Sequence, residues 1–106
     1  AHSKPEPFKT DHIAVAIFRD GKVAGYFTSR LNCNLMDASL KDSILARLTH
    51  ELYNAVYANS EADFRKPQRE VMSNLAETIT KGVNERAGKP VIENLIIEEP
   101  DFLRRL

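Results

Sequence analysis

The dipeptide Asp20-Gly21 constrains this chain more than any other short feature, because it separates two runs that are rich in apolar residues. A two-residue type I′ turn needs a positive φ at both central positions, and Asp-Gly is a preferred pair for it. Before the turn, aliphatic side chains recur at every second position, at Ile13, Val15 and Ile17. Because this is the period of a half-buried strand, we predict a β-hairpin with strands at residues 12–19 and 22–33.

The second strand of this hairpin contains Gly25, which inside a strand marks a bulge or a close approach of another backbone. Its apolar residues are Val23, Tyr26, Phe27 and Leu31.

Two helices are predicted after the hairpin. The first begins near Ser39, where Ser39 and Asp42 resemble a capping box and Asp37 is a rival N-cap, and it ends near Tyr57. Its apolar stripe has a spacing of four and is widened by two neighbours: Leu40, Ile44, Leu48, Leu52 and Val56, with Leu45 and Ala55.

The second helix follows a polar connection over residues 58–66 and starts at Pro67, since the first helical turn tolerates proline. Its stripe consists of Val71, Leu75, Ile79 and Val83, flanked by Met72, Ala76 and Ala87. Gly88 is a natural C-cap.

A β-branched run over residues 91–98 predicts a last strand, which we expect inside the sheet rather than at its edge. The tail from Pro100 to Leu106 either docks or is disordered. The predicted fold is α+β in the order ββααβ: a three-stranded sheet with two amphipathic helices packed on one face. Residues 12–106 form a single domain, and residues 1–11, with two prolines, form a linker or extended lead-in.

Composition excludes some classes of function. Fifteen Lys and Arg balance fifteen Asp and Glu, which argues against a nucleic-acid-binding domain because phosphate contacts need a basic excess. The single cysteine permits no intramolecular disulfide, and the three histidines lack metal-site spacing, so we predict no cofactor and no metal. No run reaches the roughly 20 apolar residues of a membrane-spanning helix. Ala1 in place of Met favours a processed protein or the soluble part of a longer one.

Catalysis has little support in the sequence, and we predict that the protein is not an enzyme. Cys33 with His12 on the neighbouring strand is the one conceivable nucleophile and base, although a buried cysteine is the more common arrangement. The carboxylates of Asp42, Glu51, Glu98 and Glu99 are most simply solvated surface charges.

Arg65, Lys66 and Arg69 crowd the start of the second helix, where cations oppose the helix dipole. A surface salt-bridge network with nearby acids explains them most simply, and a contact patch for an acidic partner is the alternative. We take these three residues as the candidate partner-binding site.

From Asp42 to Ile97 the chain resembles the periplasmic domain of the flagellar basal body-associated FliL family. The matching segments are Leu45-Ala-Arg-Leu48, Phe64-Arg-Lys-Pro67, Ile79-Thr-Lys-Gly-Val-Asn84-Glu-Arg and Val91-Ile-Glu-Asn-Leu-Ile-Ile97. The resemblance implies a stomatin-type domain in the periplasm, held at the inner membrane by an upstream helix. It also implies self-association and a role beside the flagellar motor stator.

Two functions are therefore expected. The first is a non-enzymatic protein-interaction domain whose expected partners are other copies of itself and the stator, with a cytosolic α+β adaptor as a variant. The second is a small ligand-binding protein or enzyme that uses the open sheet face.

Overall fold

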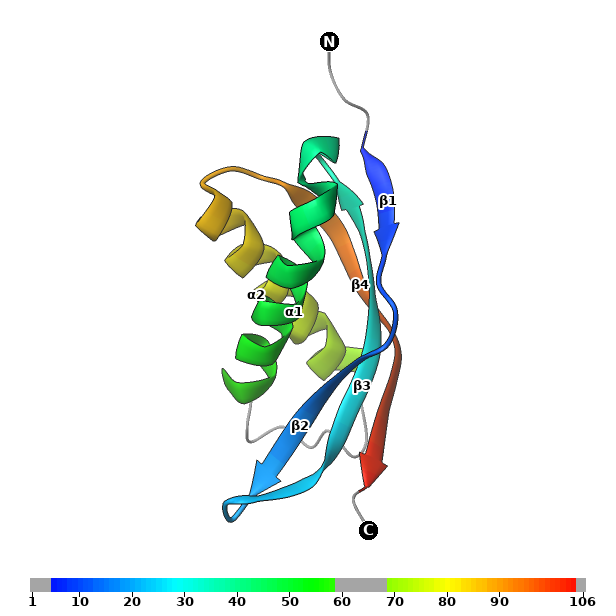
Figure 1. Ribbon diagram of the computed structural model, residues 1–106, viewed down its shortest axis with the longest axis vertical. Coiled ribbons are helices and arrows are strands. Elements are labelled where there is room, and N and C mark those ends of the chain that lie inside the picture. The colour runs from blue at the N-terminus through cyan, green and yellow to red at the C-terminus, as the bar shows by residue number, and fades with distance from the viewer. Residues whose placement is uncertain (1–4, 59–68, 105–106) are drawn as a thin grey trace.

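In the computed structural model, which describes residues 5–58 and 69–104, the strands form one antiparallel sheet and two long helices lie on one face of it (Figure 1). The elements are β1 (Glu6–Lys9), β2 (Ile13–Arg19), β3 (Lys22–Leu35), the 3-10 helix η1 (Ala38–Leu40), α1 (Lys41–Ala58), α2 (Arg69–Ala87) and β4 (Ile92–Arg104). The α+β class and the pair of helices are confirmed. The order gains one strand, β1, at its N-terminal end.

The hairpin lies where Asp20-Gly21 predicted it. Asp20 has a φ of 52° and Gly21 a φ of 76°, and Arg19 pairs directly with Lys22 across the turn. Both φ values lie in the left-handed region that a type I′ turn requires.

Gly25 has both properties that were predicted for it. The register between β2 and β3 shifts between Ile17 and Phe18, opposite this glycine. The ring of Phe102 and the carbonyl of Leu103 occupy the space that a Cβ at position 25 would need. Because β4 approaches so closely, only glycine fits here.

The central strand is β3, with which the other three strands pair. Thr28 pairs with Ala14 on one side and with Asp101 on the other, so β2 and β4 lie on opposite edges of β3. Since β4 continues along its edge as far as Leu35, β1 must lie on the same edge as β2.

The prediction that the last strand lies inside the sheet is therefore wrong. Among the described residues β4 pairs only with β3, and it extends beyond the predicted 91–98 to Arg104, so the tail is part of the sheet up to that residue. Its apolar residues face both ways: Ile97 is buried, whereas Ile96 is 57% exposed. A continuous apolar run does not reveal whether both faces are covered.

Part of the predicted lead-in belongs to the sheet as β1. Between β1 and β2, the buried Thr10 donates its N–H to the Leu31 carbonyl at 2.9 Å, and its hydroxyl accepts the Leu31 N–H at 3.0 Å. The threonine side chain thus replaces a ladder hydrogen bond, and β1 and β2 follow one edge of β3 as a single interrupted strand.

Of the two predicted N-cap candidates, Ser39 and Asp37, the structure has Asp37 as the cap. Its carboxylate accepts the Ser39 N–H at 3.0 Å and caps η1, which leads into α1. The hydrogen bonds from Ser39, followed by Lys89, lower the pKa of Asp37. The predicted stripe is buried from Ile44 onward, but Leu45 is 49% exposed and does not belong to it.

The described part of the second helix ends as predicted, with Gly88 at a φ of 73°. Its predicted start at Pro67 lies outside the described residues. Near its end, the Asn84 side chain accepts the N–H groups of Val91 and Ile92 at 2.8 and 3.1 Å. This side chain fixes the turn that leads from α2 into β4.

The core lies between the two helices and one face of the sheet. Every second residue of β3 from Gly25 to Leu35 is buried. The large side chains that are almost fully buried are Val15, Phe27, Leu31, Leu35, Ile44, Leu48, Leu52, Val56, Leu75, Ile79, Val83 and Ile92. Within residues 5–58 and 69–104, no helix lies on the opposite face of the sheet, which we call the uncovered face (Figure 1).

Candidate interaction surface

The basic patch predicted at the start of the second helix can be placed only in part. Arg69 is the first described residue of α2 and is exposed. Arg65 and Lys66 lie outside the described residues. The prediction of a partner contact at these three positions therefore stays a prediction.

Cys33 and His12, the conceivable catalytic pair, are not brought together. Cys33 lies on the helix-covered face of β3 and is only 2% exposed, and burial raises the pKa of its thiol to about 11. A thiol with this pKa is protonated near neutral pH and is a poor nucleophile. His12 instead contacts the carboxylate of Glu99 at 3.0 Å.

The uncovered face of the sheet carries an apolar row across three strands. Cross-strand partners share a face, and Tyr26 pairs with Ala16 on one side and with Leu103 on the other. Phe18, two residues after Ala16, points to the same face. The three large side chains are well exposed, at 56% for Phe18, 39% for Tyr26 and 53% for Leu103. We call these four residues the apolar row.

A polar cluster lies beside the apolar row on the same face. Glu99 contacts His12 at 3.0 Å and Arg30 at 3.7 Å, which links both edges of the sheet across β3. The neighbouring Glu98 accepts a hydrogen bond from the Asn32 amide at 2.8 Å. These contacts satisfy the polar groups of the cluster. On the same face Ile96 pairs with Asn32 and is 57% exposed, so exposed apolar side chains lie on both sides of the polar cluster, at Ile96 and in the apolar row.

The free edge of β4 is protected against pairing with another strand. Two register shifts against β3 place one extra residue of β4 at Asn94 and another at Glu99, both with positive φ, 55° and 50°. Such bulges twist an edge, and Pro100 has no N–H to offer. Strand addition at this edge is therefore unfavourable.

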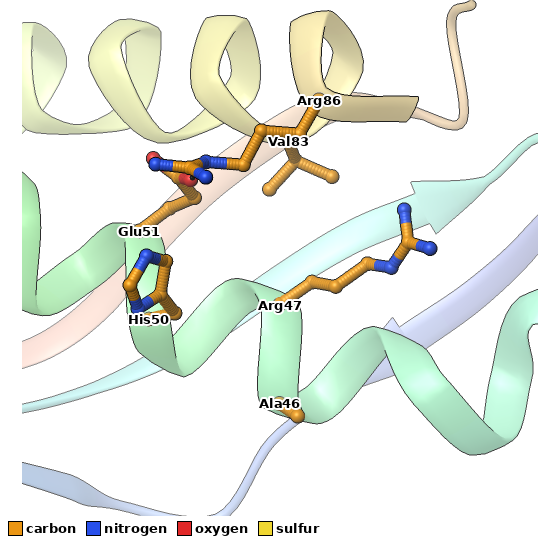
Figure 2. A pocket seen from close by; sticks show the side chains of 6 residues that line it. All are labelled: Ala46, Arg47, His50, Glu51, Val83 and Arg86. Carbon is orange, nitrogen blue, oxygen red and sulfur yellow. Dashed lines mark hydrogen bonds and ion pairs between the residues drawn. The ribbon is translucent and has the colours of Figure 1, made fainter. Parts of the chain in front are cut away.

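A depression of about 320 Å³ lies between the two helices, on the other side of the molecule from the uncovered sheet face (Figure 2). Its lining includes Glu51, whose side chain is only 8% exposed and whose Oε1 accepts the Nε–H of Arg86 at 2.5 Å. The expectation that Glu51 is a solvated surface charge is wrong. Its position on α1 turns it toward α2, where Gly82 leaves room for the carboxyl group.

Comparison with protein-family models, curated proteins and solved structures found no match. The FliL resemblance and its stomatin-type fold thus stay predictions. In the described part of the chain, no helix is long and apolar enough to cross a membrane. Within the same residues, no group of three or more His, Cys, Asp or Glu could hold a metal ion.

The sequence does contain a signal for the apolar row, although the prediction did not use it. Tyr26-Phe27 and Phe102-Leu103 are pairs of adjacent large apolar residues inside strands. Neighbouring residues of a strand point to opposite faces, so one member of each pair must leave the core side.

Proposed function

We propose that this protein is a non-enzymatic interaction domain that self-associates through the uncovered face of its sheet. The observation that carries the proposal is the apolar row, in which Tyr26 and Leu103 are direct cross-strand neighbours and Phe18 exposes a third large side chain on the same face. Contiguous apolar side chains on a surface favour association because burying them removes apolar area from water.

The size of the face is suited to a weak dimer. The central strand β3 has 14 residues, which at ~3.3 Å per residue makes the face ~46 Å long, and three strands at ~4.8 Å make it ~14 Å wide. The product, ~650 Å², is somewhat below the roughly 800 Å² per partner of a standard interface. We therefore expect association in the micromolar range or weaker.

A second copy fits the face when the two-fold axis runs parallel to the strands. This axis places β4 of one copy over β2 of the other at the same height along β3. Leu103 then lies over the partner's Ala16, a large side chain over a small one, and Tyr26 meets the partner's Tyr26. The apolar row is thus complementary to itself, as an isologous contact requires.

Charge favours the same axis. On the uncovered face β4 presents Glu93, Glu98 and Asp101, whereas β1 presents Lys9. An axis perpendicular to the strands would stack β4 on β4 and oppose these acids, which is unfavourable. The parallel axis separates them and places β4 over the partner's more basic edge.

The location and partners of the domain rest on the FliL resemblance alone. By that resemblance we place it in the periplasm, anchored to the inner membrane by an upstream segment, in support of the flagellar motor stator. Anchoring would raise the effective concentration of copies, which suits a weak interface. Fractionation of the full-length gene product tests this, since recovery in the cytosol would favour an adaptor instead.

Self-association is tested by sedimentation equilibrium of wild type, Leu103→Asp and Leu45→Asp. Leu45 is a matched control, because it is 49% exposed on α1, away from the sheet face, and Leu103 is 53% exposed. We expect a concentration-dependent dimer for wild type and for Leu45→Asp, and a monomer for Leu103→Asp. A wild-type monomer at millimolar concentration, or equal behaviour of the two variants, would contradict the proposal.

A further inference from the structure

The depression between the helices has two cationic ends and an apolar centre. In Figure 2 the guanidinium group of Arg86 lies at one end beside His50, and that of Arg47 points to the opposite end. Val83 lies between them, and Ala46 lines the side of α1. Charge and apolar surface thus alternate along a cavity of about 320 Å³.

The Arg86 end is held in place by a buried carboxylate. Within the described residues, the one contact of the Arg86 guanidinium is the hydrogen bond from its Nε–H to Glu51. The two terminal amino groups of Arg86 therefore stay available to a ligand. Gly82 gives the carboxyl group of Glu51 its space on the α2 side. The ion pair with Glu51 already orders the Arg86 side chain, so a ligand that binds the terminal amino groups causes little further loss of side-chain entropy.

The Arg47 end has no acidic partner among the described residues. Arg47 precedes Glu51 by four positions on α1, a spacing at which a helix brings side chains together. Its guanidinium nevertheless points away from Glu51 (Figure 2). The cavity therefore contains two arginines and one carboxylate, and that carboxylate is already paired.

We propose that this cavity binds a small aliphatic dicarboxylate. One carboxylate receives the terminal N–H groups of Arg86 and the other receives the guanidinium of Arg47, each in the paired hydrogen bonds that arginine makes with carboxylates. The methylene groups between them lie over Val83 and Ala46. A monocarboxylate satisfies only one end, and inorganic phosphate leaves the apolar centre uncovered.

The experiment is a titration of the ¹⁵N-labelled protein, followed by amide chemical shifts at constant ionic strength. The probes are glutarate, its monocarboxylate counterpart butyrate, and inorganic phosphate. We expect saturable shifts with glutarate that centre on residues 46–51 and 83–86, and at least tenfold weaker binding of butyrate and phosphate.

Two variants assign the site. Arg47→Gln removes the cation at one end of the cavity. Because Arg47 is exposed and makes no ion pair with the described residues, we expect the fold to be retained and glutarate binding to weaken at least tenfold. Lys41→Gln makes the same change of charge on the same helix outside the cavity, and it should bind glutarate as wild type does. Unsaturable shifts, equal affinity for butyrate and glutarate, or equal effects of the two variants would each overturn the proposal. None of these results depends on self-association through the sheet face.

Discussion

Gly82 of α2 lies directly against the carboxyl group of Glu51 of α1. A Cβ built at position 82 would lie 2.7 Å from the carboxyl carbon of Glu51, which is closer than real Cβ contacts come. The glycine and the buried ion pair between Glu51 and Arg86 therefore depend on each other. Glycine is unfavourable inside a helix, but at position 82 its lack of a side chain admits the carboxyl group of Glu51 between the two helices.

We expect the effect of Gly82→Ala to change sign with the residue at position 51. In wild type, the new methyl group displaces a carboxylate that is buried and paired, and stability should fall. In a Glu51→Ala background nothing opposes the methyl group, so the gain in helix propensity should stabilise the protein by about 0.5–1 kcal/mol. Urea unfolding of the four proteins measures the coupling, which should exceed about 1 kcal/mol. Additive effects would show that the close contact is not real.

The two buried hydroxyls Thr10 and Ser29 should respond in opposite ways to removal. Thr10→Val leaves the buried N–H of Leu31 without an acceptor and should cost about 1–3 kcal/mol. Ser29 is fully buried, and its Oγ has no hydrogen-bond partner among the described residues. Ser29→Ala should therefore be neutral or stabilise by about 1 kcal/mol. Thermal unfolding of both variants checks this, and a large loss for Ser29→Ala would reveal a partner for its hydroxyl.

Stability should fall at high pH through Cys33. Burial raises the pKa of the thiol from 9.0 to about 11, so between these values the unfolded chain loses the proton while the folded chain keeps it. The free energy of unfolding then decreases as pH rises, by about 2 kcal/mol at pH 11 relative to pH 8. The measurement is the difference in pH profile between wild type and Cys33→Ala. Parallel profiles would mean that the thiol ionises equally in both states.

The hairpin and the helices could be predicted because their signals are local. Asp20-Gly21 determines its own turn, and a stripe such as Leu48, Leu52 and Val56 identifies a helix face without any knowledge of the rest of the chain. The position of β4 could not be predicted in this way. Strand order depends on which runs pair over long distances, and the β-branched composition of β4 is compatible with a central or an edge strand.

The candidate sites show the same division. Arg47 and Glu51 are four residues apart on α1 and so share a helix face by their spacing alone, but Arg86 reaches Glu51 only through the packing of α2 on α1. The apolar row joins Ala16, Tyr26 and Leu103 from three strands, so only the pairing register brings it together. The predicted patch at Arg65, Lys66 and Arg69 was based on adjacency in sequence, which detects surfaces within one element and misses those built from several.

The central position of β3 has a consequence for synthesis on the ribosome. One edge of β3 is paired by residues made before it, whereas the other edge must wait for β4, and Gly25 pairs with Arg104 at the far end of the sheet. At about 5–20 residues per second, that edge stays unpaired for several seconds. The nascent chain therefore completes its fold only after the whole of β4, from Ile92 to Arg104, has emerged from the ribosome. A chain halted earlier presents an open strand to any neighbouring polypeptide.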